Sequence, residues 1–466
     1  MSEQMEPVLA AAEPVAEPSN SRLRAVFGPV GRFCGARSRE LKETTSGGAR
    51  KFGMVFALLA LIIFFQWRAP GGVLTSSNAQ TMILGNSFIL VMTMGMVMVI
   101  IAGHIDLSVG SVAATVGTLV ALATHESTAV ISGWGWPRWA GVLLGLAIGL
   151  SIGALQGFLV AYVGIPGFIT TLAGMMIWRG VGMWILAANG SNIPVPYEMR
   201  FLGGGHLPDI WSRSVFNLNG TTLILGVLGI TLVVLGEFRK RATAKRLEGK
   251  APLLWISATR TGIFVAVIGY LTWLFGSGRA GTGFPVPGVI ILVLAAIYWF
   301  ITTKTINGRN VYAVGGNKHA AALSGVNIKR TNFLVMMNMS LLASVAAIIF
   351  VSRSWRTGLA DGTGWELDVI ASVFIGGAAV SGGVGTVIGS LIGGMVMVVL
   401  NNGLILMGVG TAQTNIIKGV VLIAAVAFDV YNKVQGRPSL IGKMIDGLRP
   451  KKGDEATLLD KAAPVA

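Results

Sequence analysis

The chain has 466 residues, of which 53% are hydrophobic and only 12% are charged, and its mean hydropathy is +0.71. These values exclude an ordinary water-soluble globular protein, in which roughly 25% of residues carry charge. The 36 Lys and Arg against 20 Asp and Glu give a formal net charge of +16, which favours a polytopic membrane protein with basic loops facing an anionic leaflet. A single cysteine, Cys34, excludes a disulfide within the chain.

The first 51 residues predict a cytoplasmic tail, because they contain no apolar stretch of the kind that a cleaved signal peptide needs. Residues 1–21 hold four Glu among Pro and Ala and are expected to be disordered. Residues 22–51 hold eight Lys and Arg against two Glu and lie directly before the first apolar run. A second cytoplasmic tail is expected at 431–466.

Twelve apolar runs between residues 52 and 430 predict the transmembrane domain, since most approach the ~20 residues that a helix needs to cross a bilayer. The run at 367–380 is too short to cross fully, so ten crossings with broken or re-entrant segments would fit equally well. The runs lie near residues 52–66, 81–102, 108–124, 139–163, 165–187, 219–236, 258–275, 286–303, 331–352, 367–380, 384–406 and 412–430.

The distribution of basic residues predicts the orientation, because Lys and Arg next to membrane spans stay on the cytoplasmic side. With twelve spans, the four predicted inside segments hold 27 Lys and Arg, and the outside loops hold seven. Both termini are therefore expected in the cytoplasm, with the protein in a bacterial inner membrane. The inside segments are 22–51, 237–260, 304–330 and 429–466.

Two pairs of similar segments indicate an internal duplication. Residues 103–120 resemble 378–396, and residues 154–174 resemble 399–419. If the match is real, the fold is an all-α polytopic membrane protein of about 10–12 transmembrane helices in two pseudo-repeated halves, with a pathway near their interface. The alternative is that any two Gly-rich apolar segments look alike.

Several kinds of chemistry are missing. No G-x-x-x-x-G-K-[ST] loop is present, so the chain is not expected to hydrolyse ATP itself. The four His are dispersed without metal-ligand spacing, and no nucleophile stands with a base. We therefore expect no metal, no cofactor and no enzymatic activity.

Asp106 and His104 stand in GHIDLSVG between two apolar runs, where Gly103 and Gly110 permit a helix break that exposes backbone groups to a polar solute. The alternative is that Asp106 or Ser108 simply caps the next helix. Two further cations, Arg179 and Lys418, are expected near span ends, with their side chains extending to the headgroups.

Neutral polar residues in the spans, Thr171 among them, predict a pathway for a hydroxylated, uncharged solute such as a sugar. The alternative is hydrogen bonding between helices, worth about 0.6 kcal/mol per contact. The candidate pathway residues are Asn86, His104, Asp106, Ser108, Gln156, Thr170, Asn338, Asn401 and Asn402.

Glycines that recur every four residues predict helix faces where neighbouring backbones approach closely. One such seam comprises Gly141, Gly145, Gly149, Gly153 and Gly157, and a second comprises Gly385, Gly389 and Gly393.

The stretch 304–330 is too polar to cross the membrane and too patterned for a linker. A short helix is expected over 320–323, bounded by Gly315 and Gly316 before it and by Gly325 after it. Such a rigid element could dock into a groove of a soluble partner. The alternative is a basic loop held at the lipid headgroups.

Five ordered motifs carry a resemblance to a family: GHIDLSVGS, GIPGFITTLAGMMIWRG, NGRNVYAVGGNKHAAALSGVNIKR, ELDVIASVFIGGAAVSGGVGTVIGSLIGG and NNGLILMGV. Together they resemble the ribose/xylose-type permease subunits of bacterial ABC sugar importers, over roughly residues 52–430. The extra basic loop and helix pair at 237–303 favours the xylose type. This resemblance implies an ABC importer permease fold and import of a monosaccharide, D-xylose in particular.

The resemblance also implies the partners: a second copy of the chain, an ABC ATPase subunit inside, and a periplasmic sugar-binding protein outside, all at the lipid bilayer and without nucleic acid. An ion-coupled sugar carrier acting alone is the alternative, and it would need titratable groups in the pathway. The resemblance assigns ATPase docking to Gly308, Arg309, Gly315, Gly316, Asn317, Ala321, Ser324 and Gly325.

Overall fold

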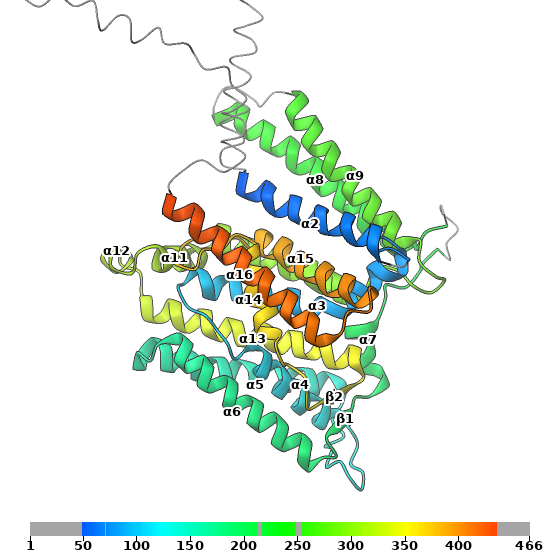
Figure 1. Ribbon diagram of the computed structural model, residues 1–466, viewed down its shortest axis with the longest axis vertical. Coiled ribbons are helices and arrows are strands. Elements are labelled where there is room, and N and C mark those ends of the chain that lie inside the picture. The colour runs from blue at the N-terminus through cyan, green and yellow to red at the C-terminus, as the bar shows by residue number, and fades with distance from the viewer. Residues whose placement is uncertain (1–48, 70, 212–216, 248–253, 436–466) are drawn as a thin grey trace, which may run out of the picture. The chain divides into compact units, whose positions relative to one another are not determined.

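The computed structural model describes residues 49–69, 71–211, 217–247 and 254–435. Residues from Gly53 onward form one compact unit, and its long helices lie side by side in Figure 1. The predicted tails at 1–51 and 431–466 lie almost wholly outside the described residues. The prediction of an all-α polytopic membrane protein is confirmed, since eight helices of the described part are long and apolar enough to cross a bilayer.

The first half of the chain forms helices whose starts are often set by proline. Pro137 and Pro166 stand directly before α5 and α6, where a proline ring costs no helical hydrogen bond. Gly164, with φ +87°, ends the turn between them. The elements are α2 Ala49–Arg68, α3 Ser76–Ile101, α4 Val109–Thr124, α5 Arg138–Phe158, the π-helical turn Leu159–Val163, α6 Gly167–Ala188, β1 Asn192–Pro194, the 3-10 turn Tyr197–Met199 and α7 Arg200–Gly204.

The second half begins with a helical hairpin. Its elements are α8 Gly220–Leu247, α9 Leu254–Gly276, α10 Val286–Lys304, α11 Ile306–Gly316, α12 Lys318–Leu323, α13 Ile328–Ser354, β2 Arg356–Gly358, α14 Trp365–Ile375, α15 Val387–Leu406 and α16 Thr411–Gln435. Strands β1 and β2 pair antiparallel, with Ile193 opposite Thr357.

Helices α3, α13 and α15 form the core, and α8 and α9 lie at the periphery. In the most apolar window of α3, 78% of the residues are buried, against 11% for α8. Because α8 and α9 pack chiefly on each other, their apolar side chains, among them Leu232 and Phe264, remain exposed. In a membrane protein such a face contacts lipid.

The predicted glycine seam of α5 is confirmed. A side chain on Gly153 would collide with the backbone of Met337, and one on Gly157 with Phe333, both on α13. Helix α13 therefore lies between α5 and α3. The second seam is confirmed only in part, because Gly389 and Gly393 face α14 across a close backbone contact whereas Gly385 precedes α15.

Three predicted boundaries differ from the structure. Helix α8 continues to Leu247 and α9 begins at Leu254, so most of the expected basic loop 237–260 is helical, because Lys, Arg and Ala favour helix beyond the apolar run. Helix α14 ends at Ile375 instead of 380, where Gly376 and Gly377 follow. Residues 306–316, for which the sequence predicted no helix, form α11.

Candidate functional site

Two short helices begin in the interior of the bundle, and their N-terminal ends meet. Gly110, in the first turn of α4, leaves no space for a side chain because the Gly362 carbonyl and the Glu366 carboxylate of α14 lie against it. Gly362 and Gly364, with φ of +75° and +77°, form the tight turn that precedes α14. Both helices therefore begin in the same region, with the N–H groups of their first turns directed toward it.

This meeting point lies well inside the bundle. Gln156, which hydrogen-bonds Ser108 at the start of α4, follows Gly153 by about one helical turn, and Gly153 packs against Met337 of α13. At about 1.5 Å per residue, Met337 lies roughly 14 Å from the start of α13 and roughly 26 Å from its end. The hydrocarbon core of a bilayer is about 30 Å thick, so α4 and α14 begin at membrane depth. We call these two short helices the half-helices.

Asp106, Ser108 and Gln156 form one buried cluster, with exposed fractions of 0%, 0% and 3%. The Asp106 Oδ1 atom accepts from the Ser108 backbone N–H at 2.8 Å and from the Ser108 hydroxyl at 2.6 Å. The Gln156 amide donates to Ser108 Oγ at 3.0 Å. Asp106 and Ser108 lie in one turn before α4. The structure brings Gln156 of α5, which is 48 positions from Ser108, into contact with them.

The Ser108 side chain does not cap α4, whereas the Asp106 carboxylate forms a local turn with the Ser108 N–H just before the helix. Ser108 stands at the N-cap of α4, but its side chain accepts no hydrogen bond from the first turn of that helix. Asp106 accepts from Ser108 itself instead. The second carboxylate oxygen, Oδ2 of Asp106, is buried and accepts no hydrogen bond from the described residues.

The rim of the cluster comes from the same loop and from α6. The Thr171 hydroxyl donates to the Ile105 carbonyl at 3.2 Å, and Gly167 lies against the His104 ring. The Arg179 guanidinium donates to the Gly362 carbonyl at 3.3 Å. Its predicted extension to the headgroups is therefore wrong, because the side chain ties α6 to the turn before α14.

Glu366 is the site residue that the sequence reasoning missed. Its side chain is 8% exposed, and its Oε2 atom, like Oδ2 of Asp106, accepts no hydrogen bond from the described residues. The carboxylate lies beside Gly110 at the start of α4, where the helix dipole favours negative charge. The signal was an acidic residue directly after the glycines of GTGWE.

Three other predicted pathway residues lie in separate contacts. The Asn86 amide donates to the Met82 carbonyl of its own helix at 3.1 Å. The Thr170 hydroxyl lies 3.4 Å from the Pro166 carbonyl. The Asn338 Oδ1 atom accepts from the Tyr298 hydroxyl, which joins α13 to α10. These contacts are of the kind expected for helix association, and a pathway role for these residues stays a prediction.

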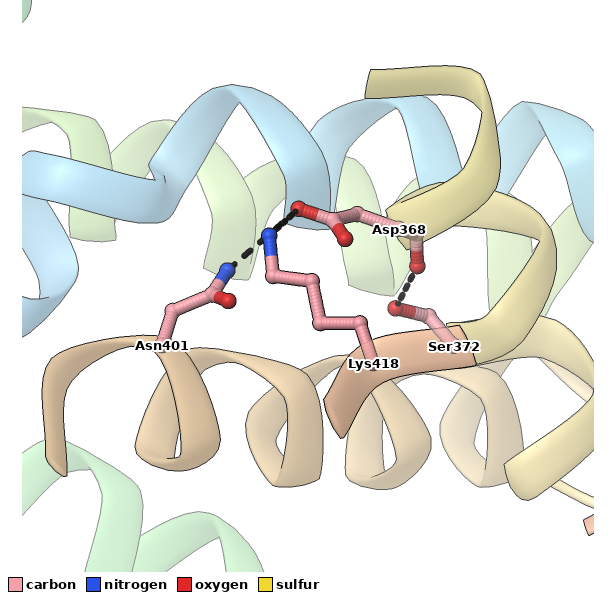
Figure 2. A network of polar contacts seen from close by, with 4 residues as sticks. All are labelled: Asp368, Ser372, Asn401 and Lys418. Carbon is pink, nitrogen blue, oxygen red and sulfur yellow. Dashed lines mark hydrogen bonds and ion pairs between the residues drawn. The ribbon is translucent and has the colours of Figure 1, made fainter. Parts of the chain in front are cut away.

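Asn401 belongs to a charged network in α14, α15 and α16. Figure 2 shows the Lys418 ammonium paired with Asp368 Oδ2 at 2.9 Å. The Asn401 amide donates to the same carboxylate oxygen at 3.4 Å. The prediction that Lys418 extends to the headgroups is therefore wrong, since its charge is neutralised inside the protein. The Ser372 hydroxyl donates to the backbone carbonyl of Asp368 at 2.7 Å.

Asn402 makes a different link. It exchanges two hydrogen bonds with Asn78 of α3, at 3.0 and 3.1 Å. Neither Asn401 nor Asn402 contacts the Asp106 cluster through a hydrogen bond between described residues. Their part in a pathway stays a prediction.

The segment predicted to dock a partner forms two consecutive short helices, α11 and α12. Asn317 caps α12 by accepting from the Ala320 N–H at 3.0 Å, and Gly325, with φ +81°, ends it. The predicted short helix is therefore confirmed. Arg309 and Ser324 are exposed, whereas Gly308 and Ala321 are buried, so the first pair is available to a partner and the second holds the helices to the bundle.

Glycines connect α11 directly to the membrane helices. A side chain on Gly315 would overlap the carbonyl oxygen of Ile101, the last residue of α3, and would lie 2.7 Å from the Gly383 nitrogen. Gly383 in turn donates to that Ile101 carbonyl at 2.8 Å. We call the contact of Gly315, Ile101 and Gly383 the glycine junction.

A tyrosine reinforces the junction. The Tyr312 hydroxyl of α11 donates to the Gly385 carbonyl at 2.8 Å. Burial raises the pKa of Tyr312 above its ordinary value, so the hydroxyl keeps its proton and remains a donor. Loop 376–386, which leads from α14 to α15, is thus held to α11 at two points.

The site gathers polar groups in the interior of the bundle. Two carboxylates, a hydroxyl, an amide and two helix N-termini lie close together there. Among the described residues, no group of three His, Cys, Asp or Glu side chains could hold a metal ion. The cluster is five residues from the end of α3, where the glycine junction lies.

Comparison with known proteins gives consistent matches. A family model described as "Branched-chain amino acid transport system / permease component" matches residues 79–426. The xylose transport system permease protein XylH of Escherichia coli (strain K12) is 32% identical over 415 residues, which cover 89% of this chain and 98% of XylH. XylH of Haemophilus influenzae is 32% identical over 381 residues, covering 82% of this chain and 96% of that protein.

A ribose permease is similar as well. The ribose import permease protein RbsC of Escherichia coli (strain K12) is 31% identical over 382 residues, which cover 82% of this chain and 93% of RbsC. No solved structure matches significantly. The matched regions include the half-helices α4 and α14 and the helices α11 and α12.

Proposed function

Because the chain belongs to the family of membrane permease components of transport systems, we propose that it is the membrane-spanning subunit of an ATP-driven ABC importer that carries a monosaccharide, D-xylose, across the bacterial inner membrane. The predicted resemblance to ribose/xylose-type permeases is confirmed. The names of the similar proteins support a sugar as substrate, and xylose before ribose because the XylH match covers more of this chain.

The glycine junction is the observation that carries this proposal. A carrier acting alone has no need for two short polar helices, such as α11 and α12, outside its membrane helices. Here α11 is in backbone contact with the end of α3 and with the loop between α14 and α15. Contacts between backbones cannot be relieved by side-chain rotation, so a displacement of α11 moves both segments.

The proposed mechanism follows from this connection. ATP binding and hydrolysis in a partner ATPase displace α11 and α12. The junction passes this movement to Ile101, and the chain from Ile101 leads directly to Asp106 and α4. On the other side, loop 376–386 passes it to α14. The two half-helices then separate and approach, and the region between them opens to one side of the membrane at a time.

The solute contacts follow from the polarity of the region. A sugar hydroxyl can donate to Oδ2 of Asp106 or Oε2 of Glu366, and it can accept from the N–H groups at the start of α4 and α14. No tight closed pocket is needed, because a separate periplasmic sugar-binding protein would select the substrate. The substrate specificity of the importer is then determined largely by that binding protein.

The proposed arrangement in the membrane places both termini and helices α11 and α12 in the cytoplasm, as the distribution of Lys and Arg favours. We assign 52–430 to the transmembrane domain, 237–303 to an accessory basic segment with helix pair, 304–330 to the docking segment, and 1–51 and 431–466 to cytoplasmic tails. A second copy of the chain completes the pathway.

Uptake of radiolabelled D-xylose, ribose and galactose in cells that lack this chain tests the proposal. The chain is restored alone or together with a matching ATPase and binding protein. Rescue that requires the full set, with xylose preferred, supports the proposal. Rescue by the chain alone that an uncoupler abolishes contradicts it.

The second candidate function is an ion-coupled sugar carrier, and one observation favours it. Asp106, Glu366 and Asp368 are all buried at 8% exposure or less, whereas the sequence suggested few such carboxylates. Embedded carboxylates are typical of proton relays. However, Asp368 is neutralised by Lys418, which leaves two groups, and the uncoupler arm of the uptake experiment distinguishes the two functions.

A further inference from the structure

A groove opens where α10 ends and α13 begins, and neither the Asp106 cluster nor the glycine junction lines it. Its volume is about 500 Å³. Helices α10, α11 and α13 form its sides, and Leu150 of α5 lies in its wall. Helices α10 and α13 are both candidates to span the membrane. The end of the groove that lies where α10 ends and α13 begins is therefore at a boundary of the bilayer.

The groove has a polar end and an apolar length. Asn307 and Asn310 of α11 and Arg330 of α13 line the polar end. Leu334, Met337 and Leu341 continue along α13. Their spacing from Arg330 of four, seven and eleven residues places all three on one helix face, where they span roughly 10 Å and end roughly 16 Å from Arg330. The groove therefore changes from cationic and amide-lined to aliphatic along its length.

The charge at the polar end has no acidic counterpart. The segment 304–330 contains five Lys and Arg and no Asp or Glu. Among the described residues, no ion pair involves Arg330, and its side chain is exposed. A guanidinium is suited to bind the oxygens of a phosphate in a bidentate manner.

From this division into a cationic end and an apolar length, we propose that the groove binds one anionic phospholipid. The phosphate lies at Arg330 and at the amides of Asn307 and Asn310. One acyl chain lies along Leu334, Met337 and Leu341. A basic pocket between membrane helices at the bilayer boundary is the setting in which lipid headgroups bind. The apolar face of about 10 Å matches the upper part of an acyl chain. The lipid lies between α11 and α13 and thus supports α11.

A sugar fits this groove less well. Along the apolar length the polar side chain is Asn338, and its Oδ1 atom already accepts from the Tyr298 hydroxyl. A monosaccharide would leave most of its hydroxyls against Leu and Met side chains, where an unpaired polar group is destabilising.

The test measures lipid retained by the purified full-length chain. The protein is extracted in mild detergent with equal amounts of phosphatidylglycerol and phosphatidylethanolamine, and native mass spectrometry counts each bound lipid. We compare the wild type with Arg330→Gln, which removes the charge, and with Leu341→Trp, which fills the apolar length. Lys329→Gln is the matched control, because Lys329 is an adjacent exposed cation that does not line the groove.

We expect one phosphatidylglycerol on the wild type and on Lys329→Gln, and at least a fivefold lower occupancy on Arg330→Gln and Leu341→Trp. Added phosphatidylglycerol should raise the thermal unfolding temperature of the first two proteins and not of the last two. Equal losses for Arg330→Gln and Lys329→Gln would mean general attraction to anionic lipid and would overturn the proposal. Displacement of the lipid by D-xylose would also overturn it, by assigning the groove to the sugar.

Discussion

Gly315→Ala is the substitution that most directly tests whether α11 transmits force to the membrane helices. The new methyl group would overlap the Ile101 carbonyl oxygen and lie 2.7 Å from the Gly383 nitrogen. Both obstacles are backbone atoms, so no side-chain rotation relieves the overlap. The neighbouring Gly316 offers a matched control, because a methyl group there meets nothing within 4 Å.

The magnitude follows from the overlap. Introducing a methyl group into a closely packed contact costs about 1–3 kcal/mol. In a two-state transporter, a coupling energy of about 1–3 kcal/mol corresponds to a roughly 5–150-fold change in the equilibrium between states. Replacing Gly by Ala also stabilises a helix by up to about 1 kcal/mol. This gain applies to both variants and cancels in their comparison.

The assay uses proteoliposomes that contain the chain with its ATPase and binding protein. We expect Gly315→Ala to transport at least tenfold less sugar per ATP hydrolysed than the wild type and Gly316→Ala to remain within twofold of it. Thermal unfolding in detergent shows whether each variant is folded. A folded Gly315→Ala protein with normal transport per ATP, or equal losses in both variants, would refute the transmission of movement through the glycine junction.

Three further outcomes are expected. Lys418→Met should lower the unfolding free energy by about 3–5 kcal/mol, because it leaves the buried Asp368 carboxylate unpaired, and Asp368→Asn should lower it by less, because the Lys418 side chain is 21% exposed. The double variant should regain most of the larger loss in thermal unfolding; a double variant as unstable as Lys418→Met would contradict the pairing. Gly153→Leu should disrupt the packing of α5 on α13 and reduce folded protein in detergent, while Gly180→Leu, with open space around it, should not; equal yields would contradict the seam. Ser108→Ala leaves Asp106 and Gln156 without their shared partner, so uptake should fall and the unfolding free energy should drop by about 1–3 kcal/mol; unchanged uptake would remove Ser108 from the site.

The helices could be predicted from the sequence because each long apolar run is bounded by residues that stop a helix. The starts of α5, α6 and α10 at proline are examples, and the predicted runs differ by a residue or two from α6, from α10, and from α5 together with the π-helical turn that continues it. Helix α11 was missed because its sequence is neither apolar nor regularly amphipathic. Its Thr305 cap, which accepts from the Gly308 N–H, was a detectable local signal.

The contacts between distant segments could not be predicted in the same way. Asp106 and Gln156 were each identified as candidates, but only the packing of α4 on α5 brings their contacts together. Glu366 was overlooked because an acidic residue near a span end resembles an ordinary loop residue. Lys418 was misinterpreted because its partner Asp368 lies 50 positions earlier, and a single sequence carries no record of that pairing.

The pairing of Asn78 with Asn402 has a consequence for the synthesis of the protein. The two residues are separated by 324 positions. At about 5–20 residues per second, the ribosome needs roughly 16–65 s to make the chain between them. During this time α3 is already made while its amide partner does not yet exist. The link between α3 and α15 through these two amides can therefore form only after α15 has been made, which makes it a late step in the assembly of the protein.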